Sequence, residues 1–178
     1  MRVITGTARG RKLKEPAGMD IRPTTDQVKE AVFNICQFDI EGRRVLDLFG
    51  GTGQLGIEAK SRGAAAVDIV DASPESIRLI KENVKLTGLD IRVTRADALS
   101  YLASCGHYDL IFLDPPYAGG LAEQALERIK AFDILSNGGI ILCETDAKTT
   151  LPELEAPLQK RKEYRYGKVK LTLYSKET

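Results

Sequence analysis

The chain has one histidine, no tryptophan and only three cysteines among its 178 residues. The cysteines, Cys36, Cys105 and Cys143, are odd in number and lack a Cys-x-x-Cys spacing, which argues against a disulfide framework or a zinc site. Buried free thiols are the expected role. The single histidine leaves no cluster of metal ligands, so we expect no metal.

Long hydrophobic runs are also missing. The apolar stretches are of strand length, and residues 1–14 lack the apolar core of a signal peptide, which predicts a cytoplasmic protein without a membrane partner. Hydrophobic residues make up 43% of the chain and charged residues 29%, as in globular proteins. We expect a monomer with one domain, residues 1–178, in which a basic arm and a lead-in helix over about 1–40 precede the core.

Charge is distributed unevenly, although the net charge is only +1. Residues 1–14, the basic arm, carry five basic residues and no acid, and residues 160–178 carry seven basic residues and two acids. If the two ends fold near one another, they form a basic rim suited to a phosphate backbone; otherwise both runs are simply solvated. The candidate RNA-binding residues are Arg9, Arg11, Lys12 and Lys14.

Apolar strands alternate with amphipathic helices, which predicts an α/β fold with a doubly wound, mainly parallel sheet of seven strands. The expected strands are 44–49, 67–71, 91–94, 109–113 and 139–144, followed by an antiparallel hairpin of 162–166 and 169–173. The sequence Thr24-x-x-Gln27 fits a capping box that begins the lead-in helix. A parallel sheet that ends in an antiparallel hairpin is typical of methyltransferases, by analogy of fold.

Asp114-Pro115-Pro116-Tyr117, directly after the apolar run 109–113, is the most informative motif. It places a carboxylate, proline carbonyls and an aromatic ring at the carboxyl end of a buried strand, where open α/β sheets bind ligands. Asp114 and the Pro115 carbonyl can accept the two hydrogens of an amino group while Tyr117 stacks on the attached ring. These three are the candidate catalytic residues; a proline-stiffened turn without catalytic function is the alternative.

The strand over 44–49 turns through glycines into a helix, and Gly51 and Gly53 begin a G-x-G-x-x-G dinucleotide pattern. Asp71, 20 residues after Gly51, can accept hydrogen bonds from the ribose of either NAD or S-adenosyl-L-methionine. Asp47 favours the second cofactor, because a carboxylate repels pyrophosphate and attracts an ammonium or sulfonium charge. Its alternative role is to accept hydrogen bonds from N–H groups of the loop.

With these motifs the chain resembles, nearly end to end, the RsmD family of methyltransferases that modify guanine N2 in 16S ribosomal RNA. The opening is similar to the family's Arg-x-Ile-x-Gly-x-x-x-Gly-Arg signature in Arg2, Ile4, Gly6, Gly10 and Arg11. Arg22-Pro23-Thr24 resembles the lead-in to its donor site, and Lys29 stands where arginine is usual. Gly50 and Thr52 are small departures in the loop, and Asp71 replaces a more frequent glutamate.

The resemblance implies methyl transfer from S-adenosyl-L-methionine, with 16S ribosomal RNA or the small ribosomal subunit as partner and an unpaired or flipped guanine as target. Together with the motifs above, it gives these candidate cofactor-binding residues: Arg22, Thr24, Asp47, Phe49, Gly51, Gly53, Asp71, Ala72, Asp97 and Ala98. Asp97 can accept from the adenine amino group or cap the next helix.

Three rival functions remain open at this stage: an amino-methyltransferase acting on DNA or another planar amine, an NAD-dependent oxidoreductase, and a non-catalytic RNA-binding module. Methylation of a pyrimidine carbon is disfavoured, because it normally requires a nucleophilic cysteine. Neither Cys105 nor Cys143 lies in a Pro-Cys context or beside an activating histidine.

Overall fold

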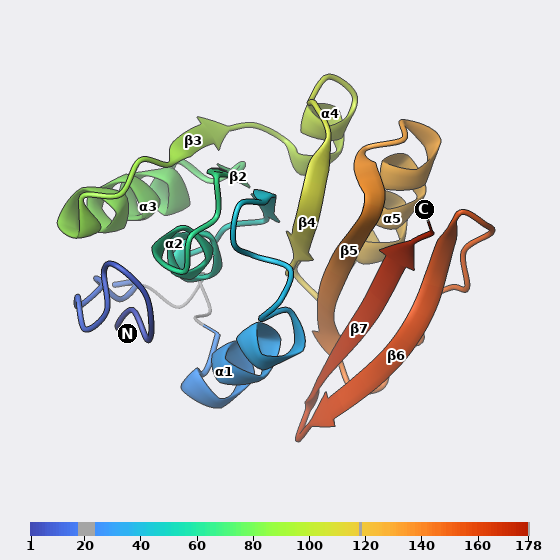
Figure 1. Cartoon of the computed structure of the whole chain (residues 1–178), viewed down its shortest axis with the longest axis horizontal. Helices are drawn as coiled ribbons and strands as arrows, with labels where there is room; N and C mark the ends of the chain where they lie inside the picture. The colour runs from blue at the N-terminus through green and yellow to red at the C-terminus, as the bar shows by residue number, and fades with distance from the viewer. Residues whose placement is uncertain (18–23, 118, 178) are drawn as a thin grey trace.

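The computed structural model describes residues 1–17, 24–117 and 119–177. At its centre is a seven-stranded sheet with the order β3-β2-β1-β4-β5-β7-β6 (Figure 1). The strands are β1 (Arg44–Leu48), β2 (Ala66–Asp71), β3 (Arg92–Arg95), β4 (Tyr108–Leu113), β5 (Leu135–Asp146), β6 (Leu158–Tyr166) and β7 (Val169–Lys176). The helices are α1 (Asp26–Ile35), α2 (Gln54–Ser61), α3 (Pro74–Thr87), α4 (Ala98–Leu102) and α5 (Leu121–Ala131).

The first five strands form parallel pairs, and β7 pairs antiparallel with both β5 and β6. The predicted parallel sheet with a C-terminal hairpin is therefore confirmed. From β1 the chain continues through α2 to β2 on one side, and from β4 it continues through α5 to β5 on the other. Such a reversal opens a crevice between the carboxyl ends of β1 and β4.

Helices cover both faces of the sheet, which explains the continuous apolar runs of its central strands. Along β4, Leu110 and Phe112 pack in a cluster with α1, α2 and α3. Ile111 and Leu113 point to the opposite face, where they pack in a second cluster with α4 and α5. Alternate side chains of one strand thus contribute to two cores.

The N-cap of α1 differs from the prediction by one residue. Thr25, not Thr24, is the cap, and its hydroxyl accepts a hydrogen bond from the Val28 N–H at 3.3 Å. Thr24 instead directs its hydroxyl towards Asp114, with 3.5 Å between Oγ1 and Oδ2. The predicted capping box starting at Thr24 is therefore wrong. Thr24 and Thr25 offer the same hydroxyl, and the contact with Asp114, which is distant in sequence, orients Thr24 away from the helix.

The basic arm packs on α2 and α3. The buried Glu58 carboxylate of α2 accepts hydrogen bonds from the backbone N–H groups of Ile4 at 2.8 Å and Thr5 at 3.0 Å. Asn83 of α3 accepts from the Lys14 N–H at 2.7 Å and donates to the Lys14 carbonyl. Buried side chains far along the sequence therefore fix the backbone of the arm at both its ends.

Glu58 also joins the arm to α1 through ion pairs. It lies 3.2 Å from the ammonium of Lys29 and 2.9 Å from Nε of Arg62, and neither Glu58 nor Lys29 is more than 1% exposed. The Lys29 ammonium donates to the carbonyl of Arg2 as well. Burial lowers the pKa of Lys29, and the charge of Glu58 opposes that shift.

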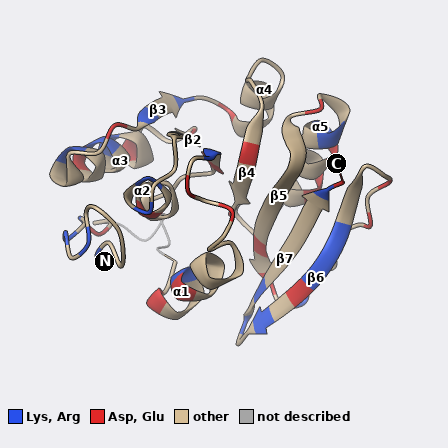
Figure 2. Cartoon of the chain, in the orientation of Figure 1, with Lys and Arg blue, Asp and Glu red and all other residues tan. Residues whose placement is uncertain are grey.

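The two basic ends of the chain lie apart (Figure 2). The basic arm lies against α2 and α3, whereas β6 and β7 form the opposite edge of the sheet. The condition for a single basic rim is not met, because β5, β4 and β1 separate the two regions. Within the hairpin, Lys160 and Lys170 pair with Glu163, and Lys176 pairs with Asp133.

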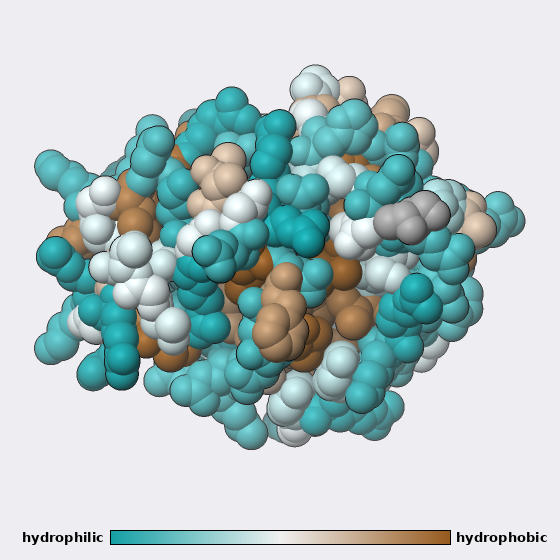
Figure 3. All heavy atoms as spheres, in the orientation of Figure 1, coloured by the Kyte–Doolittle hydropathy of each residue, from teal (hydrophilic) through white to brown (hydrophobic). Residues whose placement is uncertain are grey.

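The face seen in Figure 3 is largely hydrophilic, with apolar residues gathered near its centre. Among the residues that the structure describes, the exposed large hydrophobic side chains are Phe38, Leu86 and Phe132. Within the described ranges, no helix combines the length and the apolar character needed to cross a membrane.

Candidate active site

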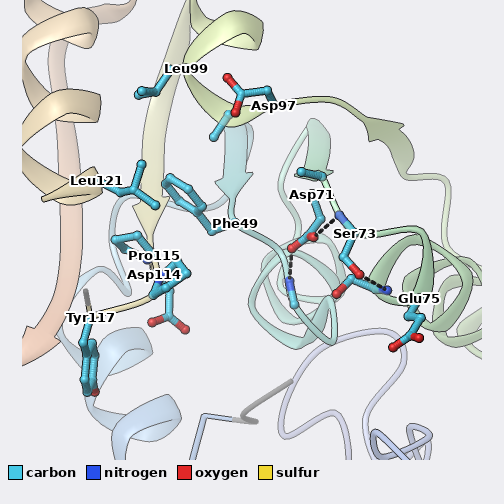
Figure 4. A pocket seen from close by; sticks show the side chains of 15 residues that line it. Phe49, Asp71, Ser73, Glu75, Asp97, Leu99, Asp114, Pro115, Tyr117 and Leu121 are labelled. Carbon is cyan, nitrogen blue, oxygen red and sulfur yellow. Dashed lines mark hydrogen bonds between the residues drawn. The ribbon is translucent and has the colours of Figure 1, made fainter. Parts of the chain in front are cut away.

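A cavity of about 630 Å³ lies at the carboxyl ends of β1, β2 and β4 (Figure 4). It brings together all three predicted catalytic residues and six of the predicted cofactor-binding residues: Asp114, Pro115, Tyr117, Phe49, Gly51, Asp71, Ala72, Asp97 and Ala98. Thr24, Asp47 and Gly53 do not line it. The predicted cofactor contact Arg22 lies outside the described residues.

Asp71, at the end of β2, fixes the glycine loop that follows β1. Its Oδ2 accepts from the Gly51 N–H at 3.0 Å, and its Oδ1 accepts from the Ser73 N–H at 2.9 Å (Figure 4). Gly51 and Gly53 both have positive φ, 60° and 83°, which glycine adopts without strain, and Gly53 is the N-cap of α2. Each carboxylate oxygen has further acceptor capacity, so Asp71 can shape the loop and also bind a hydroxyl in the cavity.

Apolar side chains form one wall of the cavity. The ring of Phe49 points into it, on the same side as Leu99 and Leu121 (Figure 4). Phe49 has a φ of 66°, a left-handed conformation that costs free energy in a residue with a bulky side chain. This wall offers a flat ligand a surface for stacking.

Asp97 caps a helix at the edge of the cavity. Its Oδ2 accepts hydrogen bonds from the N–H of Ser100 at 3.0 Å and from the Ser100 hydroxyl at 3.1 Å. The capping role that the sequence offered as an alternative is therefore present. Asp97 also lines the cavity, where its carboxylate can reach a ligand. Its contact with the adenine amino group remains a prediction.

Asp47 lies beneath the glycine loop and not at the cavity wall. It is 1% exposed, and its Oδ2 accepts from the Gly56 N–H at 2.9 Å. Burial raises the pKa of Asp47 to about 8; the charge of Asp71 adds to the shift and the bond from Gly56 opposes it. The structure thus gives Asp47 the alternative role, accepting a backbone N–H beyond the loop.

The raised pKa of Asp47 makes stability depend on pH. Between about pH 4 and pH 8 the native state keeps a proton that the unfolded chain loses, so the free energy of unfolding falls as pH rises. Asp47→Asn is expected to remove this dependence, which reduces the slope of the free energy of unfolding against pH by up to about 1.4 kcal/mol per pH unit. Urea denaturation across this range measures it, and an identical slope in variant and parent would contradict the assignment.

Asp114, Pro115 and Tyr117 follow β4 on the other side of the cavity from Asp71 (Figure 4). Asp114 and Tyr117 are half-buried and Pro115 is buried. Thr24, just before α1, contacts the Asp114 carboxylate, so α1 helps to position this corner. A carboxylate, a carbonyl and an aromatic ring are therefore held together at one end of the cavity.

The described part of the chain holds no group of three or more His, Cys, Asp or Glu that could bind a metal ion. Cys143 is buried in β5, and burial raises its pKa. Cys105 is half-buried, and burial is also the main cause of its raised pKa. Since neither thiol lines the cavity, the arrangement offers polar oxygens and aromatic surface instead of a nucleophilic sulfur.

Several lining residues were not among the predicted site residues: Ser73, Glu75, Ser76, Leu99 and Leu121. Ser73 was recognisable as the cap of α3, and the start of that helix directly after Asp71 was a usable signal, because the loop after β2 borders the crevice. Leu99 and Leu121 lie in the first turns of α4 and α5. No local pattern distinguishes them from ordinary core leucines.

The predicted RNA contacts on the basic arm lie outside the cavity. Arg9, Arg11, Lys12 and Lys14 are all exposed. Lys14 forms an ion pair with Glu82 of α3 at 3.0 Å, an exposed contact that a stronger anionic partner can displace. A contact of these four residues with RNA remains a prediction.

The family model described as conserved hypothetical protein 95 matches residues 1–175. Ribosomal RNA small subunit methyltransferase D from Escherichia coli strain K12 is 35% identical over 179 residues, which span 99% of this chain and 90% of that protein. The chain belongs to this family. The resemblance to the RsmD family, drawn from the opening signature and the Asp-Pro-Pro-Tyr motif, is therefore confirmed.

Solved structures agree with this family assignment. The Escherichia coli protein yhhF has a TM-score of 0.86 and 33% identity, and the match covers 100% of this chain and 98% of that chain. The methyltransferase SMU.776, solved in complex with SAH, has a TM-score of 0.65 and 21% identity over 84% of this chain and 48% of that chain. The second match shows the fold alone, which is that of a methyltransferase.

Proposed function

We propose that this member of the family transfers the methyl group of S-adenosyl-L-methionine to the exocyclic N2 amino group of a guanine in 16S ribosomal RNA. The observation that carries the proposal is one cavity that has Asp71 on one side and the Asp114-Pro115-Pro116-Tyr117 corner on the other. The printed name of the Escherichia coli relative supports small-subunit ribosomal RNA as the substrate.

The chemistry of the cavity fits S-adenosyl-L-methionine. Asp71 offers acceptors for ribose hydroxyls, Phe49 and Leu99 offer apolar surface for adenine, and Asp97 offers an acceptor for the adenine amino group. A volume of about 630 Å³ lies in the range of small-ligand sites. When bound, the cofactor supplies an electrophilic methyl group on a positively charged sulfur.

The charges at the cavity disfavour the rival NAD-dependent oxidoreductase. Four carboxylates line it, and its described lining residues include no lysine or arginine: Asp71, Glu75, Asp97 and Asp114 are the acids. Such a lining repels a pyrophosphate and attracts the ammonium and sulfonium of the methyl donor. S-adenosyl-L-methionine is therefore the better match.

The Asp114 corner suits a weakly nucleophilic amine. The lone pair of guanine N2 is delocalised into the ring, and hydrogen bonds from the amino group to Asp114 and to the Pro115 carbonyl favour a more tetrahedral nitrogen. Tyr117 provides a stacking surface for the base, which must leave a duplex to enter the cavity. Asp114 acts here by positioning the amine and stabilising the positive charge that develops on it.

A transfer assay tests the proposal. The protein is incubated with labelled methyl donor and with unmodified 16S ribosomal RNA, assembled small subunits or matched DNA, and the labelled nucleoside is identified by mass spectrometry. N2-methylguanosine in the RNA is the expected product. Label only in DNA, adenine, cytosine or protein would overturn the substrate assignment.

Asp71→Ala is expected to weaken the binding of adenosylhomocysteine about 10- to 100-fold, because a charged acceptor for the ribose is lost. Isothermal titration calorimetry measures the change, and NAD is expected to give no heat with either protein. Asp90→Ala, an exposed substitution between α3 and β3, serves as the control. Equal affinities in Asp71→Ala and in the control would contradict the assigned role of Asp71.

A further inference from the structure

A second hollow lies between α1 and the β6–β7 hairpin. It has a volume of about 480 Å³ and is lined mainly by Gln27, Glu30, Asn34, Ile35, Tyr164 and Tyr166. We propose that this groove, the hairpin groove, binds a single-stranded segment of the RNA substrate next to the target guanine. The proposal rests on the proposed function and adds a substrate contact distinct from the basic arm.

The lining of the hairpin groove suits unpaired bases. Tyr164 and Tyr166 are two residues apart on β6, so their side chains share one face of the strand, and both are half-buried. Tyrosine rings are stacking platforms for bases of any identity. The amides of Gln27 and Asn34 can donate to and accept from base edges, and the Glu30 carboxylate can accept from base amino groups.

The rim of the hairpin groove supplies positive charge for the phosphates. Lys162 and Lys168 are exposed on β6 and the following turn, and the Lys162 ammonium lies 4.9 Å from the centre of the Tyr164 ring. Figure 2 shows basic residues at this end of the hairpin. Neither Lys162 nor Lys168 forms an ion pair with the residues that the structure describes, in contrast to Lys160 and Lys170, which pair with Glu163. A basic rim around aromatic side chains is the arrangement of single-strand binding sites.

Two elements, α1 and β5, link the hairpin groove to the catalytic corner. Thr24, which contacts Asp114, is followed one turn later by Gln27 at the start of α1. On the sheet side, Leu113 of β4 lies opposite Cys143 of β5.

Strand β5 leads from Cys143 to the turn of the β6–β7 hairpin. Asp146 of β5 lies opposite Val169, so three residues of β5, about 10 Å, separate the two pairings. An RNA strand whose guanine reaches Asp114 can therefore continue into the hairpin groove.

The composition of the hairpin groove favours RNA over a protein partner. Its aliphatic lining is limited to Ile35 and the small, buried Ala31, whereas a helix or loop of a protein needs an apolar surface to bury. The basic rim also lies on the other side of α1 from the basic arm, whose Arg2 carbonyl contacts Lys29. Two separate cationic regions thus flank the helix that leads from the catalytic corner.

The charge test compares Lys162→Gln/Lys168→Gln with the control Arg128→Gln/Lys130→Gln on α5, on the opposite face of the sheet. Binding of an unmodified 16S ribosomal RNA transcript is measured over a series of salt concentrations. The hairpin variant is expected to raise Kd about tenfold and to reduce the slope of log K against log salt by about 1.4, because two phosphate contacts are lost. The control is expected to retain the parent values.

The stacking test uses Tyr166→Ala, which is expected to raise Kd about tenfold, with Tyr166→Phe close to the parent protein. Adenosylhomocysteine affinity shows whether each variant is folded, and the charge pair carries the test if Tyr166→Ala does not fold. A photoreactive p-benzoylphenylalanine at position 166 is expected to crosslink to RNA in small subunits. Crosslinks to ribosomal protein alone, or no crosslink, would overturn the proposal.

The outcomes separate this proposal from the proposed function. If both hairpin variants kept the Kd and the salt slope of the parent protein while the parent formed N2-methylguanosine, the RNA contact would be rejected. The proposed activity would then stand. Hairpin-dependent RNA binding without methyl transfer to guanine would instead reject the activity and leave the contact.

Discussion

Asp114→Asn is expected to lower kcat about 10²- to 10³-fold while the affinity for adenosylhomocysteine stays within about twofold of the parent value. The variant keeps the shape of the corner and the neighbouring hydroxyl of Thr24. It loses the negative charge that stabilises the cationic amine, and one acceptor oxygen becomes an NH₂ donor that opposes the substrate amino group. Single-turnover transfer at saturating donor measures the loss.

The control for this substitution is Asp90→Asn, which changes an exposed carboxylate between α3 and β3 by the same atoms. It is expected to leave kcat and donor affinity unchanged. If Asp114→Asn kept kcat within tenfold of the parent, Asp114 would not be the group that binds the amine. If donor affinity fell together with kcat, the effect would lie in the shape of the cavity instead.

Glu58→Gln is expected to reduce the free energy of unfolding by about 3–5 kcal/mol, because it leaves the buried ammonium of Lys29 without its counter-charge. The same change weakens the bonds to the N–H groups of Ile4 and Thr5, so the basic arm loosens as well. Urea denaturation measures the stability.

The double variant Lys29→Met/Glu58→Gln tests the cause of this loss. Removing both charges is expected to recover part of the stability, since the cost of Glu58→Gln arises from the unpaired cation. Arg62→Gln, which breaks the more exposed ion pair, is expected to cost less than Glu58→Gln. If Glu58→Gln lowered the free energy of unfolding by less than about 1 kcal/mol, Glu58 would not be the counter-charge that stabilises the buried Lys29.

The parallel strands could be predicted because a strand that is buried on both faces consists of consecutive apolar residues, as in β4. The ends of β5 could not be predicted in this way. The expected strand covered 139–144, but β5 extends over Leu135–Asp146, because Leu135 pairs with Tyr108 and Asp146 pairs with Val169. Those pairings depend on segments distant in the chain, and local composition does not encode them.

The same distinction applies to the site. Asp71 and Asp114 follow strands that could be identified, so their place at the cavity could be predicted from order alone. Asp47 follows the same sequence logic, yet its depth below the glycine loop depends on how α2 packs, and it accepts a bond from Gly56 instead of facing the cavity. Glu58 would pass for a solvated helix residue, because the segment that buries it precedes it by more than fifty positions.

The anchors of the basic arm have a consequence for biosynthesis. Ile4 and Lys14 leave the ribosome well before Glu58 and Asn83, the side chains that hold their backbone groups. A nascent chain that ends before Asn83 offers the arm only part of its docking surface, so its cations remain on a mobile peptide. The basic arm precedes α2 and α3 in the chain, but it can acquire its native conformation only after both helices have emerged.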